Sequence, residues 1–188
     1  MVQRGFEEAQ RTALHERRQT ELARSLSTFL ADASLALDAP GSREEMLQLV
    51  CEQARELVAA TCCVATLAEE GAPRAVQAVS HDATGRRWAT FVRWLDPRTV
   101  SDVVHRNGGS ARAAGEAVAD RFPHATGDDA PEGWLAASLT ALDGTQIGLI
   151  QAFDRQGGAF TAEDEAALVH LAQMASAAVE RARLYGGR

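Results

Sequence analysis

The stretch that decides the fold is DGTQIGLIQAFDRQGGAFTAEDEAALVHLAQMASAAVERARLY, residues 143–185. Asp143 and Gly144 favour a two-residue hairpin turn, since a glycine at positive φ lets the flanking strands keep their twist. Residues 147–154 form a continuous apolar run, which is typical of a central strand covered on both faces. The segment before the turn, WLAASLTAL, residues 134–142, alternates in polarity, so a strand hairpin is predicted here.

A long helix is predicted over residues 161–185. Thr161 is a favoured N-cap residue, and Asp164 in the first turn suits the positive end of the helix dipole. Such a helix is about 37 Å long at the usual rise per residue, so we expect it to extend beyond a small sheet. Its free end should pair with the amphipathic N-terminal helix of the same chain and of a second copy. The apolar stripe consists of Leu168, Leu171, Ala175, Ala178, Ala182 and Tyr185.

Two further helices are predicted at the start of the chain. Apolar residues three or four apart over residues 6–37 predict an amphipathic helix, which Pro40 and Gly41 end. Ser42 and Glu45 have the spacing of a capping box, which opens a second helix. Two helices therefore precede any strand.

The segments 61–68 and 74–80 are predicted to pair as antiparallel strands. Two short helices are predicted between residues 84 and 107. Residues 108–133, which begin with GGSARAAG, are interpreted as loop with one weak strand near Ala117. The middle of the chain is thus its least regular part.

Composition excludes several classes of protein. The net charge of −7 and the lack of a basic cluster oppose binding to nucleic acid. No apolar run approaches the roughly 20 residues that cross a bilayer, so no membrane contact is expected. The N-terminal segment is charged and lacks the apolar core of a signal peptide, which predicts a cytoplasmic protein.

The order of these elements resembles the GAF domain, a sensor module of bacterial histidine kinases and related signalling regulators. The likeness is strongest over the last third of the chain, which looks like the closing segment of such domains. It implies an α+β fold, in which a central antiparallel sheet of about five to six strands is flanked by N-terminal helices and a long C-terminal helix. Residues 1–40 are then expected to form a signalling or dimerisation helix, and residues 41–188 the GAF domain.

Five residues fall where cyclic-nucleotide-binding members carry an Asn-Lys, Phe, Asp-Glu motif: Asp154, Arg155, Phe160, Asp164 and Glu165. Asp154 and Arg155 replace the Asn and the Lys, which argues against cyclic-nucleotide binding. An ion pair between Arg155 and Asp164 is still expected, since Arg can hold a carboxylate through two parallel hydrogen bonds. The resemblance therefore gives Arg155, Phe160 and Asp164 a structural role, joining the last strand to the last helix.

The large aromatic residues Trp88, Phe91, Trp94 and Trp134 lie within or just after the irregular middle. Indole and phenyl faces stack on planar groups, so these residues are candidates to line a pocket for a flat ligand. Packing of irregular segments onto the sheet explains them equally well. His105, near the end of a short helix, is the candidate haem ligand, and a solvated histidine near a helix end is the simpler interpretation.

The cysteines give little support to an enzyme. Adjacent Cys62 and Cys63 on a strand point to opposite faces and cannot easily bond to each other. Free methionine sulfoxide reductases are GAF enzymes with cysteines on pocket loops, whereas Cys51, Cys62 and Cys63 fall on a predicted helix and strand. No catalytic residue and no metal site are therefore assigned. A covalent bilin is not expected, because no Cys follows His81 or His105, where phytochromes attach one.

We interpret the chain as a non-catalytic sensory module of a bacterial two-component or related signalling system, acting as a homodimer. A small ligand is expected between the sheet and residues 84–133, and the terminal helices would transmit its binding to a downstream kinase or phosphatase domain. The alternatives are a ligand-free module for dimerisation or partner docking, and an enzyme similar to the methionine sulfoxide reductases.

Overall fold

The computed structural model describes Arg24 and residues 42–68, 75–83 and 85–185. One antiparallel sheet of five strands, in the order β2-β1-β5-β4-β3, forms the centre and confirms the predicted α+β fold. The predicted helix over residues 6–37 lies outside the described residues. The strands are β1 (Ala60–Leu67), β2 (Val76–His81), β3 (Ser110–Ala114), β4 (Gly133–Thr140) and β5 (Gln146–Arg155); the helices are α2 (Ser42–Leu57), α3 (Gly85–Trp94), α4 (Pro97–Arg106), α5 (Glu116–Arg121), the short 3₁₀ helix η2 (Gly127–Asp129) and α6 (Ala162–Tyr185).

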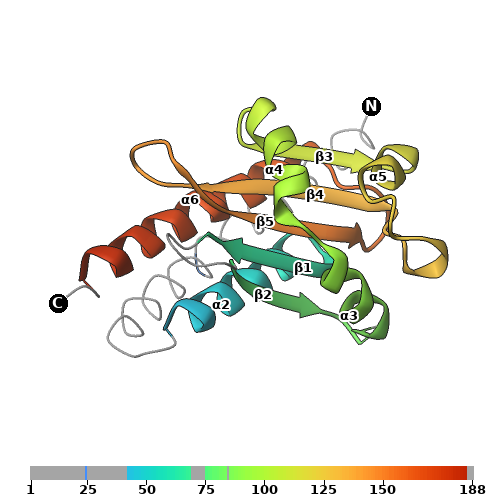
Figure 1. The fold of residues 1–188 in the computed structure, drawn as a ribbon, viewed down its shortest axis with the longest axis horizontal. Coiled ribbons are helices and arrows are strands. Elements are labelled where there is room, and N and C mark those ends of the chain that lie inside the picture. Colours follow the sequence, from blue (N-terminus) through green and yellow to red (C-terminus); the bar gives the residue numbers. More distant parts are fainter. Residues whose placement is uncertain (1–23, 25–41, 69–74, 84, 186–188) are drawn as a thin grey trace, which may run out of the picture.

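Helices cover both faces of the sheet. In Figure 1, α2 and α6 lie behind the sheet, and α3 and α4 lie in front of it. Each face has its own hydrophobic core, because the side chains of a strand point alternately to the two faces. Cys63 and Ile150 belong to the core beneath α2 and α6, whereas Cys62 and Phe153 belong to the core beneath α3, α4 and α5.

The apolar run predicted as a central strand is β5, which pairs with β1 on one side and β4 on the other. Close packing between these strands leaves room only for glycine at one position. A Cβ on Gly148 would collide with the carbonyl oxygen of Thr66 and come within 2.9 Å of Leu139 Cδ1. The absence of a side chain at Gly148 therefore lets the three central strands approach one another.

The hairpin between β4 and β5 forms at the predicted place with one more residue in its loop. The backbone N–H of Ala141 donates to the carbonyl of Thr145 at 2.8 Å, so three residues form the loop instead of two. Gly144 has a φ of 86°, which is the positive φ expected of it. A three-residue loop with glycine in this position is the next most favoured hairpin connection.

The irregular middle contains three short elements that the sequence pattern did not predict, which are β3, α5 and η2. Residues 110–114, interpreted as loop, form the edge strand β3, which pairs with β4. The weak strand expected near Ala117 is wrong, because Ala117 lies in the short helix α5. Small residues carry no strand signal of their own, so pairing with β4 makes this segment a strand.

Helix α6 spans 24 residues and confirms the predicted long C-terminal helix. The described side chains of its apolar stripe are buried within a single chain; even Ala178 is only 7% exposed. The stripe therefore packs against the sheet and α2, and the surface that α6 offers to other molecules is its outward side. The exposed outward residues include Ala166, His170, Gln173 and Ala177.

No helix in the described ranges is long and apolar enough to cross a membrane.

One residue between α2 and β1 is held in an unfavourable backbone conformation. Ala59 has a φ of 50°, in the left-handed region that costs a residue with a Cβ about 1–2 kcal/mol. Glycine avoids this cost, but it loses more conformational entropy on folding, which lowers the stability of the folded state by about 0.5–1 kcal/mol. We expect Ala59→Gly to raise the free energy of unfolding by about 0.5–1 kcal/mol in urea titrations.

Ala89, which is exposed on α3, provides the matched control. The same substitution there has only the entropic penalty, so Ala89→Gly should lower the free energy of unfolding by about 1 kcal/mol. Equal destabilisation by both variants would contradict the strain at Ala59.

Candidate functional site

Five aromatic side chains form a layer between the sheet and helices α3, α4 and α5. Their neighbouring ring centroids are 4.9 to 6.1 Å apart, mostly in edge-to-face geometry. This aromatic layer contains three of the predicted pocket residues and two that the sequence analysis missed. The predicted members are Trp88, Phe91 and Trp134, and the missed members are Phe122 and Phe153.

The two missed residues had weak signals in the sequence. Phe153 belongs to the apolar run of β5, where alternation alone gives it to the face opposite Ile150. Phe122 follows α5 in a segment interpreted as loop. The signal for Phe153 was therefore available in the strand period, whereas Phe122 is brought in only by the folded middle of the chain.

Two predicted pocket residues do not join the aromatic layer. Trp94, the last residue of α3, is 74% exposed. His105, near the end of α4, is also exposed, so its ring is not held among the aromatic side chains. Haem ligation by His105 therefore gains no support from its position.

A buried glutamine lies on β5 in the same layer. Gln151 is 0% exposed, and its Oε1 accepts a hydrogen bond of 3.0 Å from Trp134 Nε1. Its Nε2 has no hydrogen-bond partner, and neither has Nε1 of Trp88, which is also 0% exposed. Buried polar groups are nearly always satisfied in folded proteins, so two unpaired donors in one apolar layer are an unusual feature.

Two arginines border the aromatic layer, each stacked on one of its indoles. The guanidinium carbon of Arg87 lies 4.5 Å from the ring centre of Trp88, and that of Arg121 lies 4.6 Å from the ring centre of Trp134. The Nε atoms of both arginines are buried without a hydrogen-bond partner. Both contacts are favourable cation–π arrangements, and they bring positive charge to the rim of the layer.

Asp154 at the end of β5 ties α3 to the sheet. Its Oδ2 accepts a hydrogen bond of 2.7 Å from Nη2 of Arg87. Its Oδ1 accepts hydrogen bonds from the backbone N–H groups of Glu132 and Gly133, at 2.7 and 2.8 Å. One carboxylate therefore connects α3, the start of β4 and the end of β5.

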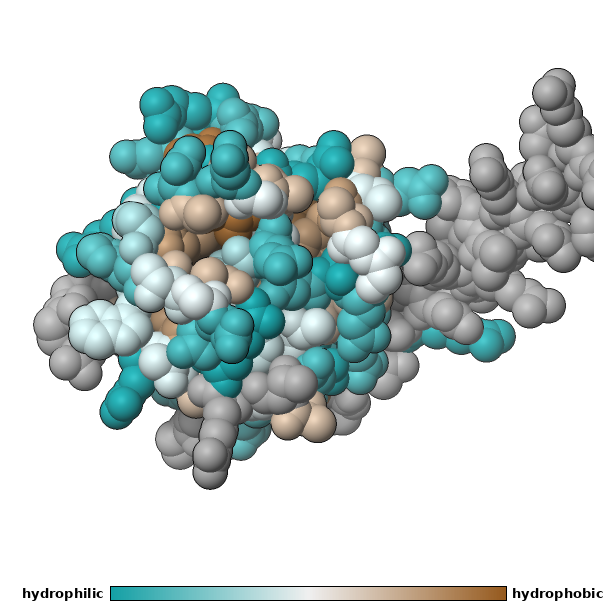
Figure 2. All heavy atoms as spheres, turned by 90° about the vertical axis from the view of Figure 1, so that its right-hand side faces the viewer, coloured by the Kyte–Doolittle hydropathy of each residue, from teal (hydrophilic) through white to brown (hydrophobic). Residues whose placement is uncertain are grey.

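Figure 2 looks onto the end of the molecule where β5 finishes. Apolar surface gathers there in a recess that hydrophilic side chains frame. Recessed apolar surface with a few polar groups nearby is the usual setting of a small-molecule site. A recess of apolar surface therefore lies at the end of the molecule where β5 finishes.

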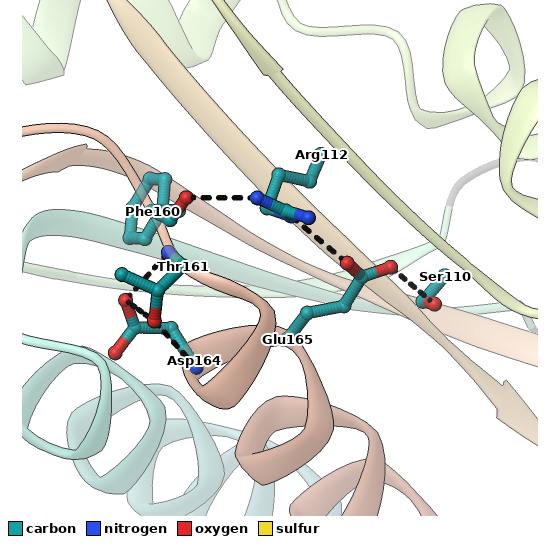
Figure 3. Close-up of polar contacts among 6 residues, drawn as sticks. All are labelled: Ser110, Arg112, Phe160, Thr161, Asp164 and Glu165. Carbon is teal, nitrogen blue, oxygen red and sulfur yellow. Dashed lines mark hydrogen bonds and ion pairs between the residues drawn. The ribbon is translucent and has the colours of Figure 1, made fainter.

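The predicted ion pair between β5 and α6 is present, on the side of the sheet that α6 covers. Arg155 Nε lies 2.8 Å from Asp164 Oδ2, close enough for an ion pair although the N–H is not aligned as a hydrogen bond. The same oxygen accepts hydrogen bonds from the backbone N–H and hydroxyl of Thr161, at 2.8 and 2.9 Å. The Asp164 N–H donates back to the Thr161 hydroxyl at 3.2 Å, which completes a capping box (Figure 3).

A groove of about 610 Å³ lies along the edge strand β3 and the start of α6. Arg112 Nε pairs with Glu165 Oε2 at 3.0 Å, and Ser110 Oγ donates to Glu165 Oε1 at 2.7 Å (Figure 3). Arg112 also donates to the carbonyl of Phe160 at 3.2 Å. The groove is lined by Asn107, Ser110, Ala111, Arg112, Ala113, Ala114, Ala159, Phe160 and Glu165.

The three cysteines are free and buried. Burial raises the pKa of the Cys62 thiol above its ordinary value, and burial likewise raises that of Cys63, with a contribution from a hydrogen bond to Cys51. A thiol must ionise to act as a nucleophile, so Cys62 and Cys63 are suited to packing and not to catalysis. Among the described residues, no group of three or more His, Cys, Asp or Glu side chains could hold a metal ion.

Comparisons with known proteins agree with this architecture. A family model described as GAF domain matches residues 42–181. The chain is similar to the GAF domain of an Acinetobacter phosphoenolpyruvate-protein phosphotransferase, with 15% identity over 88% of this chain and 96% of that one, and a TM-score of 0.59. The corresponding domain from Coxiella burnetii has 19% identity over 88% and 99%, with a TM-score of 0.57.

A third similar structure is the GAF domain of a putative sensor histidine kinase from Pseudomonas syringae pv. tomato. It has 19% identity over 90% of this chain and 97% of that one, with a TM-score of 0.53. No curated protein matches the chain. At these identities the similarity to solved structures shows a shared fold and nothing of the ligand.

Proposed function

The chain belongs to the GAF domain family, and we propose that it is a non-catalytic sensor that binds a small molecule and acts as a homodimer. GAF domains are sensory or regulatory modules of signalling proteins, as in the similar histidine kinase domain. The burial of all three cysteines, with the raised pKa of Cys62 and Cys63, supports a non-catalytic role for this chain and argues against the alternative of a methionine sulfoxide reductase.

The aromatic layer is the observation that carries the proposal. Its rings contact one another, and its polar groups include the unpaired donors of Trp88 and Gln151. Because the rings are already in contact, a flat ligand fits only if α3, α4 or α5 moves away from the sheet. Ligand binding would then change the protein's conformation, which is what a sensor requires.

Two consecutive residues offer a route from this layer to α6. Asp154 bonds Arg87 of α3, and Arg155 pairs with Asp164 of α6. Movement of α3 would therefore pull on the end of β5, to which the start of α6 is also attached. This supports α6 as the element that passes the signal to a kinase or phosphatase output domain, in the cytoplasm of a bacterium.

Native mass spectrometry of the purified protein tests ligand binding and dimerisation together. We expect a dimer that carries extra mass, which is lost on denaturation. A dimer without extra mass would favour a docking module, and a bare monomer would overturn the role of α6 as a dimeric output helix.

The outward side of α6 is the place to test the dimer. Ala178 is unsuitable because it is buried within one chain, whereas Ala177 is exposed. Ala177→Glu should yield a monomer in sedimentation experiments while its far-UV circular dichroism stays unchanged. Ala89→Glu on the other face of the protein is the matched control and should leave the dimer intact.

The groove beside β3 favours a second candidate function, which is docking of a partner protein. Among the described strands, β3 lies at the edge of the sheet and pairs with β4 alone. The hydrogen bond of 2.8 Å from Ser138 N–H to the Gly109 carbonyl fixes the phase of this pairing, so alternate backbone groups of β3 face away from β4. An exposed edge of this kind can pair with a strand from another protein.

A further inference from the structure

The described polar side-chain groups in and around the aromatic layer include several unpaired hydrogen-bond donors and no unpaired acceptor. In the described part of the chain, the buried side-chain atoms without a hydrogen-bond partner include Trp88 Nε1, Gln151 Nε2, and Nε of both Arg87 and Arg121. All four belong to the layer or stack on its indoles. Each is a nitrogen that carries hydrogen, so all four are donors and none is an unpaired acceptor.

The orientation of the Gln151 side-chain amide follows from its hydrogen bond with Trp134. An indole N–H can only donate, so the hydrogen bond from Trp134 Nε1 requires the oxygen of the Gln151 amide on that side. The NH₂ group of Gln151 is then the end of the amide without a hydrogen-bond partner. Exchanging the oxygen and nitrogen of this amide would face two donors toward each other, so the unpaired atom of Gln151 is a donor.

Arg121 adds a positive charge that pairs with no carboxylate in the described part of the chain. Arg87 pairs with Asp154, but none of the ion pairs among the described residues involves Arg121. Its guanidinium instead lies over Trp134, at the rim of the layer. An uncompensated guanidinium beside unpaired donors favours an anion, and a carboxylate matches its geometry best.

We infer that the ligand of the aromatic layer is a flat aromatic carboxylate, whose ring stacks among Trp88, Phe91 and Trp134 and whose carboxylate is bound by Arg121. This inference rests on the proposed function, since it names the chemical class of the ligand at that site. The five rings supply apolar faces for the body of the ligand. A bare inorganic anion would leave those faces unused, and a neutral ring would leave the charge of Arg121 without a counterion.

Isothermal titration of the full chain with 2-naphthoate and with 2-naphthamide tests the inference, because the two probes differ only in the charged group. We expect 2-naphthoate to bind at least about tenfold more tightly than 2-naphthamide. Arg121→Gln should remove this difference by weakening only the naphthoate. Arg106→Gln is the matched control, since Arg106 is exposed on α4 and should leave both affinities unchanged.

Arg121→Lys guards against a folding defect, since it keeps the charge and should retain part of the preference for naphthoate. Equal binding of the two probes, or an unchanged preference in Arg121→Gln, would overturn the carboxylate and leave the small-molecule sensor standing. Failure of both probes to bind would also overturn the aromatic carboxylate. It would indicate that water satisfies the donors of the layer. The proposed function is judged separately, by the mass of whatever the native protein retains.

Discussion

Replacement of Phe153 by alanine is expected to lower the free energy of unfolding by about 3–5 kcal/mol. Phe153 is 0% exposed at the centre of the aromatic layer. Its ring centre lies 5.9 Å from that of Trp88, 4.9 Å from Phe91 and 5.7 Å from Phe122. Truncation removes the ring that these three side chains share, and the surrounding rings cannot all close the cavity.

Urea unfolding followed by circular dichroism measures this loss. Phe153→Leu is the control, because it keeps most of the buried volume and should lose only about 1–2 kcal/mol. A loss below about 1.5 kcal/mol for Phe153→Ala would contradict a tightly packed layer. It would mean that α3 or α5 closes readily onto the sheet.

Asp164→Ala is expected to destabilise the protein by about 3 kcal/mol or more, because it breaks two interactions at once. Asp164 is 4% exposed, and its removal leaves the Arg155 guanidinium, whose side chain is 17% exposed, without its carboxylate. It also removes the acceptor for the backbone N–H of Thr161 at the start of α6. Loss of a helix cap alone costs about 1 kcal/mol.

Glu163→Ala separates these effects from a general loss of acidic charge. Glu163 is in the same first turn but is exposed, so its removal should cost no more than about 0.5 kcal/mol. A double-mutant cycle of Asp164→Ala with Arg155→Gln should give a coupling energy of about 1 kcal/mol or more. A loss for Asp164→Ala no larger than that for Glu163→Ala would refute the proposed link between β5 and α6.

Much of the fold was predictable, because its signals are local. The apolar run of β5, the glycine of the hairpin and the Thr161 cap each depend on residues close together in the chain. Strand β3 was not predictable, because SARAA contains no strong strand former, and only pairing with β4 orders it. The predicted N-terminal helix over residues 6–37 stays a prediction.

The candidate site was predicted in part for the same reason. Large aromatic residues in an irregular segment identified Trp88, Phe91 and Trp134, but the sequence could not tell buried rings from exposed ones. Trp94 looked equivalent to Trp88, yet one is 74% exposed and the other 0%. Which face of a short helix turns inward depends on how the helix packs, and that is a property of the assembled domain.

The sequence by itself determined the family, the central strands and the long C-terminal helix, together with the pair of Arg155 and Asp164. The strands and the helix follow from periodicity and spacing, which act over a few residues, whereas the family and the ion pair were expected from the resemblance to GAF domains. Only the tertiary structure decided that Gln151, Arg121 and Trp88, far apart in the chain, border one apolar layer with their donors unpaired. Such a surplus exists only once folding has removed these groups from water, so no stretch of sequence contains it.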